Sequence, residues 1–493
     1  MSVIAPDETR RTPAPPPGTF LGMPAFPVNA EQQLANAQLR ANLARATATI
    51  RAKRALRVAE VPQWEDLRAA AAAIKDRVLA NLDTYLLQAE ANLTKAGATV
   101  HWARDGDEAN RIVTELVRAT GATDVVKVKS MVTQETDLNE ALERAGIAAW
   151  ETDLAELIVQ LGHDRPSHVL VPAIHRNRRE IREIFLAEMG RYGTPAPPGL
   201  SDDPAELAGA ARAHLREKFL VADVAISGGN FIVADTGTLV VVESEGNGRM
   251  CLTLPDTLIS VVGIEKLVPT FEDLEVFLRL LPRSSTGERM NPYTSMWTGV
   301  TAGDGPQNVH VVLVDNGRTR ALADPVGREA LRCIRCSACM NICPVYREVG
   351  GHAYGSVYPG PIGIVLTPQL RGLDSAIDRS LPFASTLCGA CVEVCPVGID
   401  FPKLIVHLRR LVADRERTEP GLEPAVMAVG EWAFGQGKHL SLVERVAEIA
   451  GRVFGPWRFF RKLPWPGSLW TSGRDLPVPP RESFRHWWKR VKP

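Results

Sequence analysis

Residues 333–344 read CIRCSACMNICP, and residues 388–396 read CGACVEVCP. The first run has the spacing C-x2-C-x2-C-x3-C-P, which is typical of bacterial ferredoxins that hold two iron-sulfur clusters. The second run matches the last three cysteines of the same pattern. Seven of the eight cysteines of the chain lie in these two runs, and only Cys251 lies outside them. This clustering predicts metal ligation in this part of the chain.

In two-cluster ferredoxins the fourth cysteine of a run binds the other cluster. Applied to both runs, this crossed pattern predicts two sites. The complete site has four thiols, those of Cys333, Cys336, Cys339 and Cys395. The short site has three thiols, those of Cys343, Cys388 and Cys391, and Ser385 stands where a fourth cysteine belongs. We expect [4Fe-4S] in the complete site. For the short site two states stay open: [4Fe-4S] completed by Ser385, water or another donor, or [3Fe-4S].

Other uses of clustered cysteines fit this spacing less well. Structural zinc takes four Cys or His ligands per tetrahedral site, and three consecutive C-x2 steps followed by C-P fit that need badly. An odd number of cysteines in two tight groups argues against a disulfide framework. A cluster that only stabilises the fold stays an alternative to one that carries electrons. Cys251 is expected to be a small buried residue without a ligand role.

The rest of the chain predicts a multi-domain protein of ordinary globular composition. Of its 493 residues, 45% are apolar and 23% are charged. Two helices are expected first, one opening with Asn29 and Gln32 at capping-box spacing and one running from Pro62 to Gly97. Alternating β-rich and helical runs then predict an α/β domain, with SHVLVPA at 167–173 among the β-rich runs. The expected parts are a proline-rich arm (1–28), N-terminal helices (29–97), an α/β domain (98–322), an α-helical two-cluster ferredoxin-like domain (323–412) and a C-terminal helical, Trp- and Arg-rich tail (413–493).

Charge and hydropathy limit the partners and the location. The 57 basic and 57 acidic residues balance, so the chain has no overall positive charge that would attract nucleic acid. No nucleic acid is predicted as a partner. No apolar run reaches the roughly 20 residues that span a bilayer. We expect a cytoplasmic protein. Residues 452–493 carry ten Lys and Arg against two acids, with five tryptophans. This tail is interpreted either as an anchor for a partner or a membrane surface, or as a segment whose rings pack on the body.

A glycine-rich segment in the α/β part is a second candidate site. Gly228 and Gly229 permit positive φ and close approach of a ligand, and Asp235, Thr236 and Thr238 offer polar groups. The competing interpretation is a pair of tight turns. The segment matches neither the dinucleotide-binding fingerprint nor the P-loop, so no nucleotide is predicted. Between the cysteine runs, His352 lies in a glycine- and aromatic-rich loop and is expected to be hydrogen-bonded rather than an iron ligand.

The order of these parts resembles the lactate-utilisation protein B family, the iron-sulfur subunit of a bacterial L-lactate oxidation system. The resemblance rests on VADVAISGGNFIVADTGTLVVVESEGNGRM, CIRCSACMNICPVYREVGGHAYGSVYPGPIG and LCGACVEVCPVGIDFPKLI, and it covers nearly the whole chain after the proline arm. It implies an α/β domain of the ribose-phosphate isomerase and CoA-transferase-like kind. The family pattern also has seven cluster cysteines, so Ser385 is no departure from it. The resemblance implies L-lactate oxidation to pyruvate with two partner proteins, one of them also iron-sulfur.

Two functions follow as hypotheses. In the first, the chain is an electron-transfer subunit, which the paired cysteine runs favour, with an electron acceptor that the sequence does not indicate. In the second, the α/β domain is itself catalytic on a small acyl or sugar-phosphate ligand, with Glu243 as nucleophile or base and the clusters as accessories. Only fold analogy favours the second. Contact of the tail with a membrane surface is compatible with both.

Overall fold

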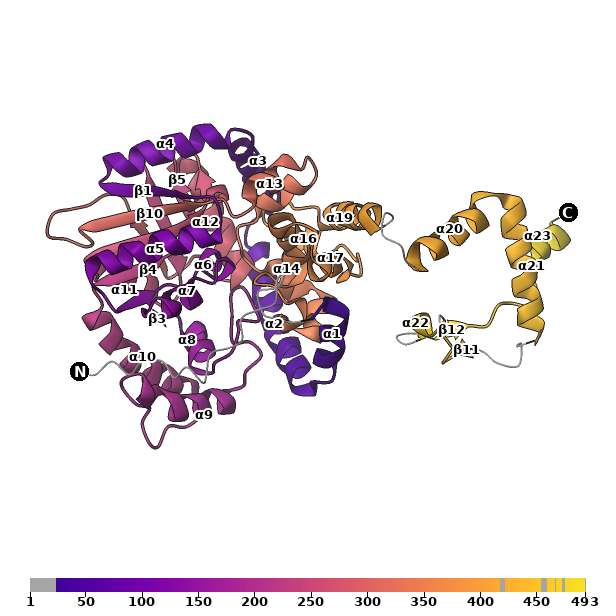
Figure 1. Cartoon of the computed structure of the whole chain (residues 1–493), viewed down its shortest axis with the longest axis horizontal. Coiled ribbons are helices and arrows are strands. Elements are labelled where there is room, and N and C mark those ends of the chain that lie inside the picture. The colour runs from indigo at the N-terminus through magenta and orange to yellow at the C-terminus, as the bar shows by residue number, and fades with distance from the viewer. Residues whose placement is uncertain (1–23, 417–421, 454–458, 466, 472–474, 493) are drawn as a thin grey trace. The chain divides into compact units, whose positions relative to one another are not determined.

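The computed structural model describes residues 24–416, 422–453, 459–465, 467–471 and 475–492 (Figure 1). Most of the expected proline-rich arm lies outside these residues. The chain divides into two compact units, a first unit up to Arg410 and a second unit from Leu411 onward.

A six-stranded parallel sheet forms the centre of the first unit. Its strands lie in the order β1, β10, β7, β4, β2, β3, and every neighbouring pair is parallel. The strands are β1 (Ala98–Ala103), β2 (Asp124–Lys127), β3 (Ala148–Glu151), β4 (Val224–Ser227), β7 (Thr257–Gly263) and β10 (Asn308–Val314). Strands β4 and β7 are buried along their whole length, as expected of parallel strands covered on both faces. The predicted α/β domain is confirmed.

Alternate residues of these strands enter two separate cores, which shows that helices cover both faces. Leu258 and Val311 belong to the core that includes α4 (Leu82–Lys95). Their neighbours in the chain, Ile259 and Val312, belong to the core that includes α5 (Gly106–Thr120). Because side chains of a strand point to opposite faces in turn, α4 and α5 cover opposite faces of the sheet. Further helices of this domain are α6 (Met131–Glu135), α7 (Leu138–Arg144), α8 (Leu154–Leu161), α9 (Arg178–Glu188), α10 (Pro204–Val221) and α11 (Asn247–Thr253).

A smaller sheet carries the predicted glycine-rich segment. It has the order β8, β5, β6, β9, with β5 at Phe231–Val233, β6 at Thr238–Glu243, β8 at Leu267–Val268 and β9 at Tyr293–Trp297. Residues Ala234–Gly237 turn the chain between β5 and β6, and Gly237 has φ +68°. Helix α12 (Phe271–Ser285) packs on this sheet, where the rings of Phe277 and Phe231 lie 5.2 Å apart.

The predicted N-terminal helices are each broken once. Instead of one helix capped by Asn29, the chain forms α1 (Phe26–Leu34) and α2 (Ala37–Ala59). Asn36 is the N-cap of α2, since its side chain accepts from Leu39 N, and Asn29 is buried inside α1. The predicted helix from Pro62 to Gly97 is likewise two helices, α3 (Trp64–Ala80) and α4, which separate at Asn81. The prediction failed because apolar spacing continues across both breaks.

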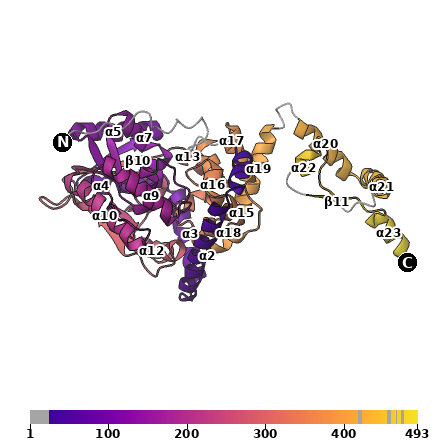
Figure 2. The ribbon, with the colours of Figure 1, turned by 90° about the horizontal axis from the view of Figure 1, so that it is seen from below.

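The cysteine-rich part is helical and packs on α2 (Figure 2). Its helices are η4 (Gly327–Arg332), α14 (Ala338–Ile342), α15 (Pro344–Val349), α16 (Gly360–Arg371), α17 (Ala376–Ser380), α18 (Ala390–Val394) and α19 (Phe401–Glu416). The segment SHVLVPA at 167–173 is not the predicted strand. It is an irregular loop whose His168 Nε2 lies 3.1 Å from Asn341 Oδ1, inside the first cysteine run.

The second unit contains α20 (Leu422–Gly435), α21 (Gly437–Val453), α22 (Ser468–Thr471) and α23 (Phe484–Val491), with a two-stranded sheet of β11 (Phe459–Phe460) and β12 (Leu476–Pro477). Glu448 of α21 joins α23, since it accepts from Ser483 N and from His486 Nδ1 at 2.7 and 2.6 Å. Among the residues described in both units, no helix is long and apolar enough to cross a bilayer.

Candidate metal centres

The four thiols of the predicted complete site line one cavity. Cys333 and Cys336 come from the loop between η4 and α14, Cys339 lies in the first turn of α14, and Cys395 follows α18. The loop wraps around the cavity because Arg335 and Ser337, on either side of Cys336, have φ of +62° and +63°. Such left-handed residues are uncommon outside glycine, and they turn the chain sharply enough to aim closely spaced side chains at one centre.

The three thiols of the predicted short site line a second cavity, together with Ser385. Cys343 comes from the end of the first run, and Cys388 and Cys391 come from the second run. Leu387 and Gly389, which flank Cys388, have φ of +57° and +82°. The second loop therefore repeats the backbone conformation of the first, with Ser385 at the position of Cys333.

One hydrogen bond is also repeated between the two loops. In the first loop Arg335 N donates to Cys333 Sγ at 3.4 Å, and in the second Leu387 N donates to Ser385 Oγ at 3.1 Å. Two further thiols accept from the backbone, Cys343 from Tyr346 N at 3.5 Å and Cys395 from Ile399 N at 3.4 Å. Backbone N–H groups aimed at sulfur stabilise negative charge on a thiolate.

The chemistry of both cavities fits an iron-sulfur cluster. Burial, together with neighbouring thiols, raises the pKa of Cys336 and Cys339 well above the ordinary value, and it raises the pKa of Cys395 to about 11 and of Cys391 to about 12. Thiolates therefore persist in these cavities only beside a cationic centre. A set of soft sulfur ligands suits iron-sulfur clusters. The identity and number of the bound ligands stay predictions.

The two sites differ in their exposure. Cys336, Cys339 and Cys395 of the first site are buried and Cys333 is half-buried. In the second site Cys343 is buried, Cys391 is half-buried and Cys388 is exposed. The second site therefore lies closer to solvent. Cys251 lines neither cavity; it is buried, and burial raises its pKa to about 12, as expected of a residue without a ligand role.

A buried charge network, which the sequence analysis missed, joins the first cysteine loop to the carboxyl ends of the central strands. Arg335 Nη1 donates to Cys333 O at 3.0 Å, and Arg335 Nη2 lies 3.1 Å from Glu265 Oε1, just after β7. Glu265 also binds Arg318, which follows β10, and both side chains are fully buried. Arg318 in turn makes two hydrogen bonds to Glu135, of 2.9 and 3.0 Å.

The charges in this network stabilise one another. Burial disfavours each charge, but Arg318 and Arg335 lower the pKa of Glu265, and Glu135 and Glu265 raise the pKa of Arg318. Tyr358 lies in the loop between the cysteine runs, and its hydroxyl donates to Glu135. The guanidinium of Arg335 lies 4.7 Å from the centre of the Tyr358 ring. In the sequence, Glu265 and Arg318 come shortly after β-rich runs. This position alone does not reveal that the two side chains pair.

Glu243 and the glycine-rich segment have structural contacts. Both carboxylate oxygens of Glu243 accept backbone hydrogen bonds, from Gly246 and Glu245 at 2.6 and 3.1 Å and from Arg249 at 3.1 Å. These bonds hold the start of α11. A Cβ on Gly228 would lie 2.4 Å from Ser130 Oγ, so this glycine permits close packing of two chain segments.

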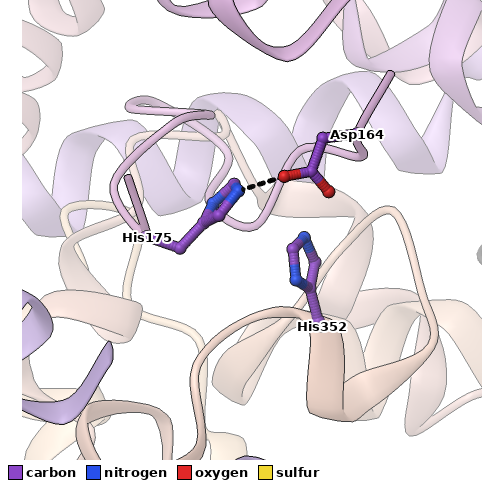
Figure 3. A group of neighbouring side chains, drawn as sticks. All are labelled: Asp164, His175 and His352. Carbon is purple, nitrogen blue, oxygen red and sulfur yellow. Dashed lines mark hydrogen bonds and ion pairs between the residues drawn. The ribbon is translucent and has the colours of Figure 1, made fainter. Parts of the chain in front are cut away.

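His352 lies beside Asp164 and His175, and one possible ligand atom from each of the three residues lies within 4.8 Å of the others (Figure 3). His175 Nε2 donates to Asp164 Oδ2 at 2.7 Å, and its Nδ1 lies 2.7 Å from Ser167 Oγ. Asp164 also accepts from Arg176 and from Arg165 N, and His352 Nε2 donates to Arg165 O at 2.8 Å. The hydrogen bond from His352 to Arg165 O connects the loop between the cysteine runs to the α/β domain.

Residues 86–314 match the LUD domain family, and residues 329–399 match the 4Fe-4S dicluster domain family. The chain is 44% identical to lactate utilization protein B of Oceanobacillus iheyensis, over 87% of this chain and 88% of that protein. It is 41% identical to lactate utilization protein B of Bacillus subtilis, over 95% and 96%. A crystal structure of a DUF162 family protein from Deinococcus radiodurans aligns with 47% of this chain and 98% of its own, at 15% identity and a TM-score of 0.27.

Proposed function

The chain belongs to the lactate utilization protein B family, and from this premise we propose that it is the iron-sulfur electron-transfer subunit of a multi-protein system that oxidises L-lactate to pyruvate. One observation carries the proposal: seven thiols line two cavities whose loops have the same backbone conformation. Two sites built from interleaved thiols lie close together, and this closeness suits the transfer of electrons from one cluster to the other.

In this proposal the first cavity holds a [4Fe-4S] cluster on Cys333, Cys336, Cys339 and Cys395, and the second holds a cluster on Cys343, Cys388 and Cys391. Clusters of this kind accept and release single electrons when bound. The chain supplies burial, backbone N–H donors to sulfur, and the cation of Arg335 beside the first site. Ser385 is the proposed neighbour of the iron that lacks a cysteine.

The different exposure of the two sites indicates which site exchanges electrons with a partner protein. The first site is buried and contacts the α/β domain through Arg335 and Glu265. The second has the exposed Cys388, with the exposed side chains of Phe383 and Leu387 on the same loop. A partner protein therefore exchanges electrons at the second site. The proposed partners are two other lactate utilisation proteins, one of them also iron-sulfur, and contact with a membrane surface is assigned to the tail.

A reduction experiment tests this function. L-lactate is added anaerobically to the purified chain, alone and with its two partner proteins, and the visible absorbance of the clusters is followed. Bleaching that requires the partners supports the relay. Bleaching of the chain alone would instead support catalysis by its α/β domain, and persistent absorbance in both cases would refute a role in lactate oxidation.

A further inference from the structure

A polar cavity of about 680 Å³ opens at the carboxyl ends of β1 and β10. Its wall includes the loops that follow these strands, the start of α13 (Arg318–Ala323) and the end of α16. In parallel α/β sheets small molecules bind at the carboxyl ends of the strands. The volume falls within the roughly 300–1,000 Å³ of ordinary small-molecule sites. Neither cysteine site shares a residue with this cavity.

Three guanidinium groups from three different elements line the cavity. Arg104 follows β1, Arg320 lies on α13, and Arg371 ends α16. Arg104 Nε and Nη2 donate to Glu108 at 2.9 and 3.4 Å, and Arg371 Nε lies 3.6 Å from Asp378; both of these carboxylates lie outside the cavity lining. Arg320 contacts the carbonyl of Leu370 at 3.5 Å.

The two carboxylates in the cavity wall are engaged by the chain itself. Asp315 accepts from Thr319 N and Thr319 Oγ1, each at 2.7 Å, with a different oxygen. Asp105 is the N-cap of α5 and accepts from Glu108 N at 2.9 Å. These bonds stabilise the local turns and occupy carboxylate oxygens of both acids, while the guanidinium groups bring the positive charge to the cavity wall.

The floor of the cavity is held in an unusual conformation. Asn316 has φ +41°, which is uncommon for a residue with a side chain, and Gly317 has φ +87°. A Cβ on Gly317 would lie 2.1 Å from Leu370 O, so this position requires glycine. The Asn316 amide donates to Glu135 Oε2 at 3.3 Å, which fixes the floor to the buried charge network. Strained backbone that the surroundings hold in place is typical of binding sites.

We propose that this cavity binds a small molecule through an oxyanion, a carboxylate or a phosphate group, with Arg104, Arg320 and Arg371 as donors. Guanidinium groups suit this ligand because their paired N–H groups match two oxygens of an oxyanion. The site goes beyond the proposed function, since an electron relay alone needs no small-molecule site. The chain of contacts from Asn316 through Glu135, Arg318 and Glu265 to Arg335 links the cavity to the first cysteine loop.

Isothermal titration calorimetry of the anaerobic, cluster-loaded chain tests the site. The probes are sodium L-lactate, sodium pyruvate and inorganic phosphate at millimolar concentration and constant ionic strength, with sodium chloride as the blank. We expect saturable binding of at least one oxyanion, weakened at least about tenfold in Arg320→Gln, because a charged hydrogen bond is lost. Arg320→Lys keeps the charge and should lose less. Arg212→Gln, an exposed arginine of α10 outside the cavity, should bind as the wild type does.

The outcomes distinguish a carboxylate ligand from a phosphate ligand, and they show whether the cavity binds an oxyanion at all. Binding of lactate or pyruvate alone identifies a carboxylate, and binding of phosphate alone identifies a phosphate ligand. No saturable heat with any probe, or equal affinity in wild type and Arg320→Gln, overturns the proposal. Cluster absorbance and circular dichroism establish that each variant is folded. Failure of lactate to reduce the clusters in the presence of the partners would refute the relay and leave this binding result unaffected.

Discussion

Ser385 stands in the second cysteine loop where Cys333 stands in the first. Its hydroxyl lines the second cavity and accepts the equivalent backbone hydrogen bond. A cluster held there by three cysteines has one iron without a thiolate and should lose that iron first. We therefore expect mild oxidation to convert only the site of Cys343, Cys388 and Cys391 to [3Fe-4S], and Ser385→Cys to suppress the conversion. Electron paramagnetic resonance of the oxidised protein, at equal iron loading, measures both.

Glu393→Cys is the matched control for this exchange, because it adds a thiol at an exposed position of the second cysteine run that does not line either cavity. It should leave the conversion unchanged. If Ser385→Cys loses iron as readily as wild type, residue 385 does not face the open iron. If wild type resists oxidation at both sites, another group already completes the second site.

Single cysteine exchanges test the crossed ligand assignment. Cys333 and Cys388 lie in different loops and line different cavities. Cys388→Ser should leave the four-cysteine cluster intact, whereas Cys333→Ser should remove it, because each exchange withdraws one soft ligand from one site only. The spin signals of the reduced variants and their iron content provide the measurement. Loss of the same cluster in both variants would show that the assignment is wrong.

At the scale of elements, the ends of β7 and β10 meet the first cysteine loop through buried charges. Arg318 contacts both Glu135 and Glu265 and is fully buried. Arg318→Met leaves two buried carboxylates without this cation, which should destabilise the first unit by about 3–5 kcal/mol. Urea unfolding of the cluster-loaded protein, compared with Arg212→Met on exposed α10, gives the difference. A change in the free energy of unfolding no larger than that of the control would mean that the network contributes nothing to stability.

The sequence predicted elements well where a local pattern determines them. The alternation of β-rich and helical runs gave the α/β domain, and cysteine spacing gave the two groups of thiols that line the cavities. Helix breaks at Asn36 and Asn81 were missed, because they depend on a cap and on a local change of backbone direction within continuous apolar spacing. The loop at 167–173 has a β-rich composition, but contacts such as Tyr346 to Ser167 O hold it in irregular form.

Helix α23 is the element in which the basic and aromatic character of the tail is concentrated. Phe484, Trp487 and Trp488 are exposed, and Arg485 and Lys489 lie on the same short helix. Such a helix suits the interface of an anionic bilayer. Deleting residues 452–493 should leave cluster content intact and abolish co-sedimentation with phosphatidylglycerol vesicles. The difference in sedimentation between the intact and the shortened chain should be greatest at low salt, where charges are least screened.

Phosphatidylcholine vesicles are the control for this prediction, because they lack the negative charge and should bind the intact chain weakly. Equal sedimentation of the intact and shortened chains would exclude a role of the tail at the membrane surface. Loss of folding on deletion would show instead that the tail is part of the core.

At the scale of the whole molecule, the first unit combines a LUD domain and a 4Fe-4S dicluster domain that share contacts. The loop at 163–176, the network from Glu135 to Arg335 and the group around His352 all join the two. The sequence could not predict these contacts, because they pair residues separated by as many as 223 positions and have no periodic signature. They place the buried first site beside the α/β domain and leave the second site nearer to solvent.

The most direct test of the relay is the iron and acid-labile sulfide content of the anaerobically purified chain, measured together with its tightly bound zinc. We predict about seven or eight iron atoms per chain, a similar amount of sulfide and negligible zinc, as one cluster of four iron atoms and one of three or four require. About four iron atoms per chain would mean that a single cluster forms and that no relay between two sites exists. Bound zinc with negligible sulfide would contradict the account entirely.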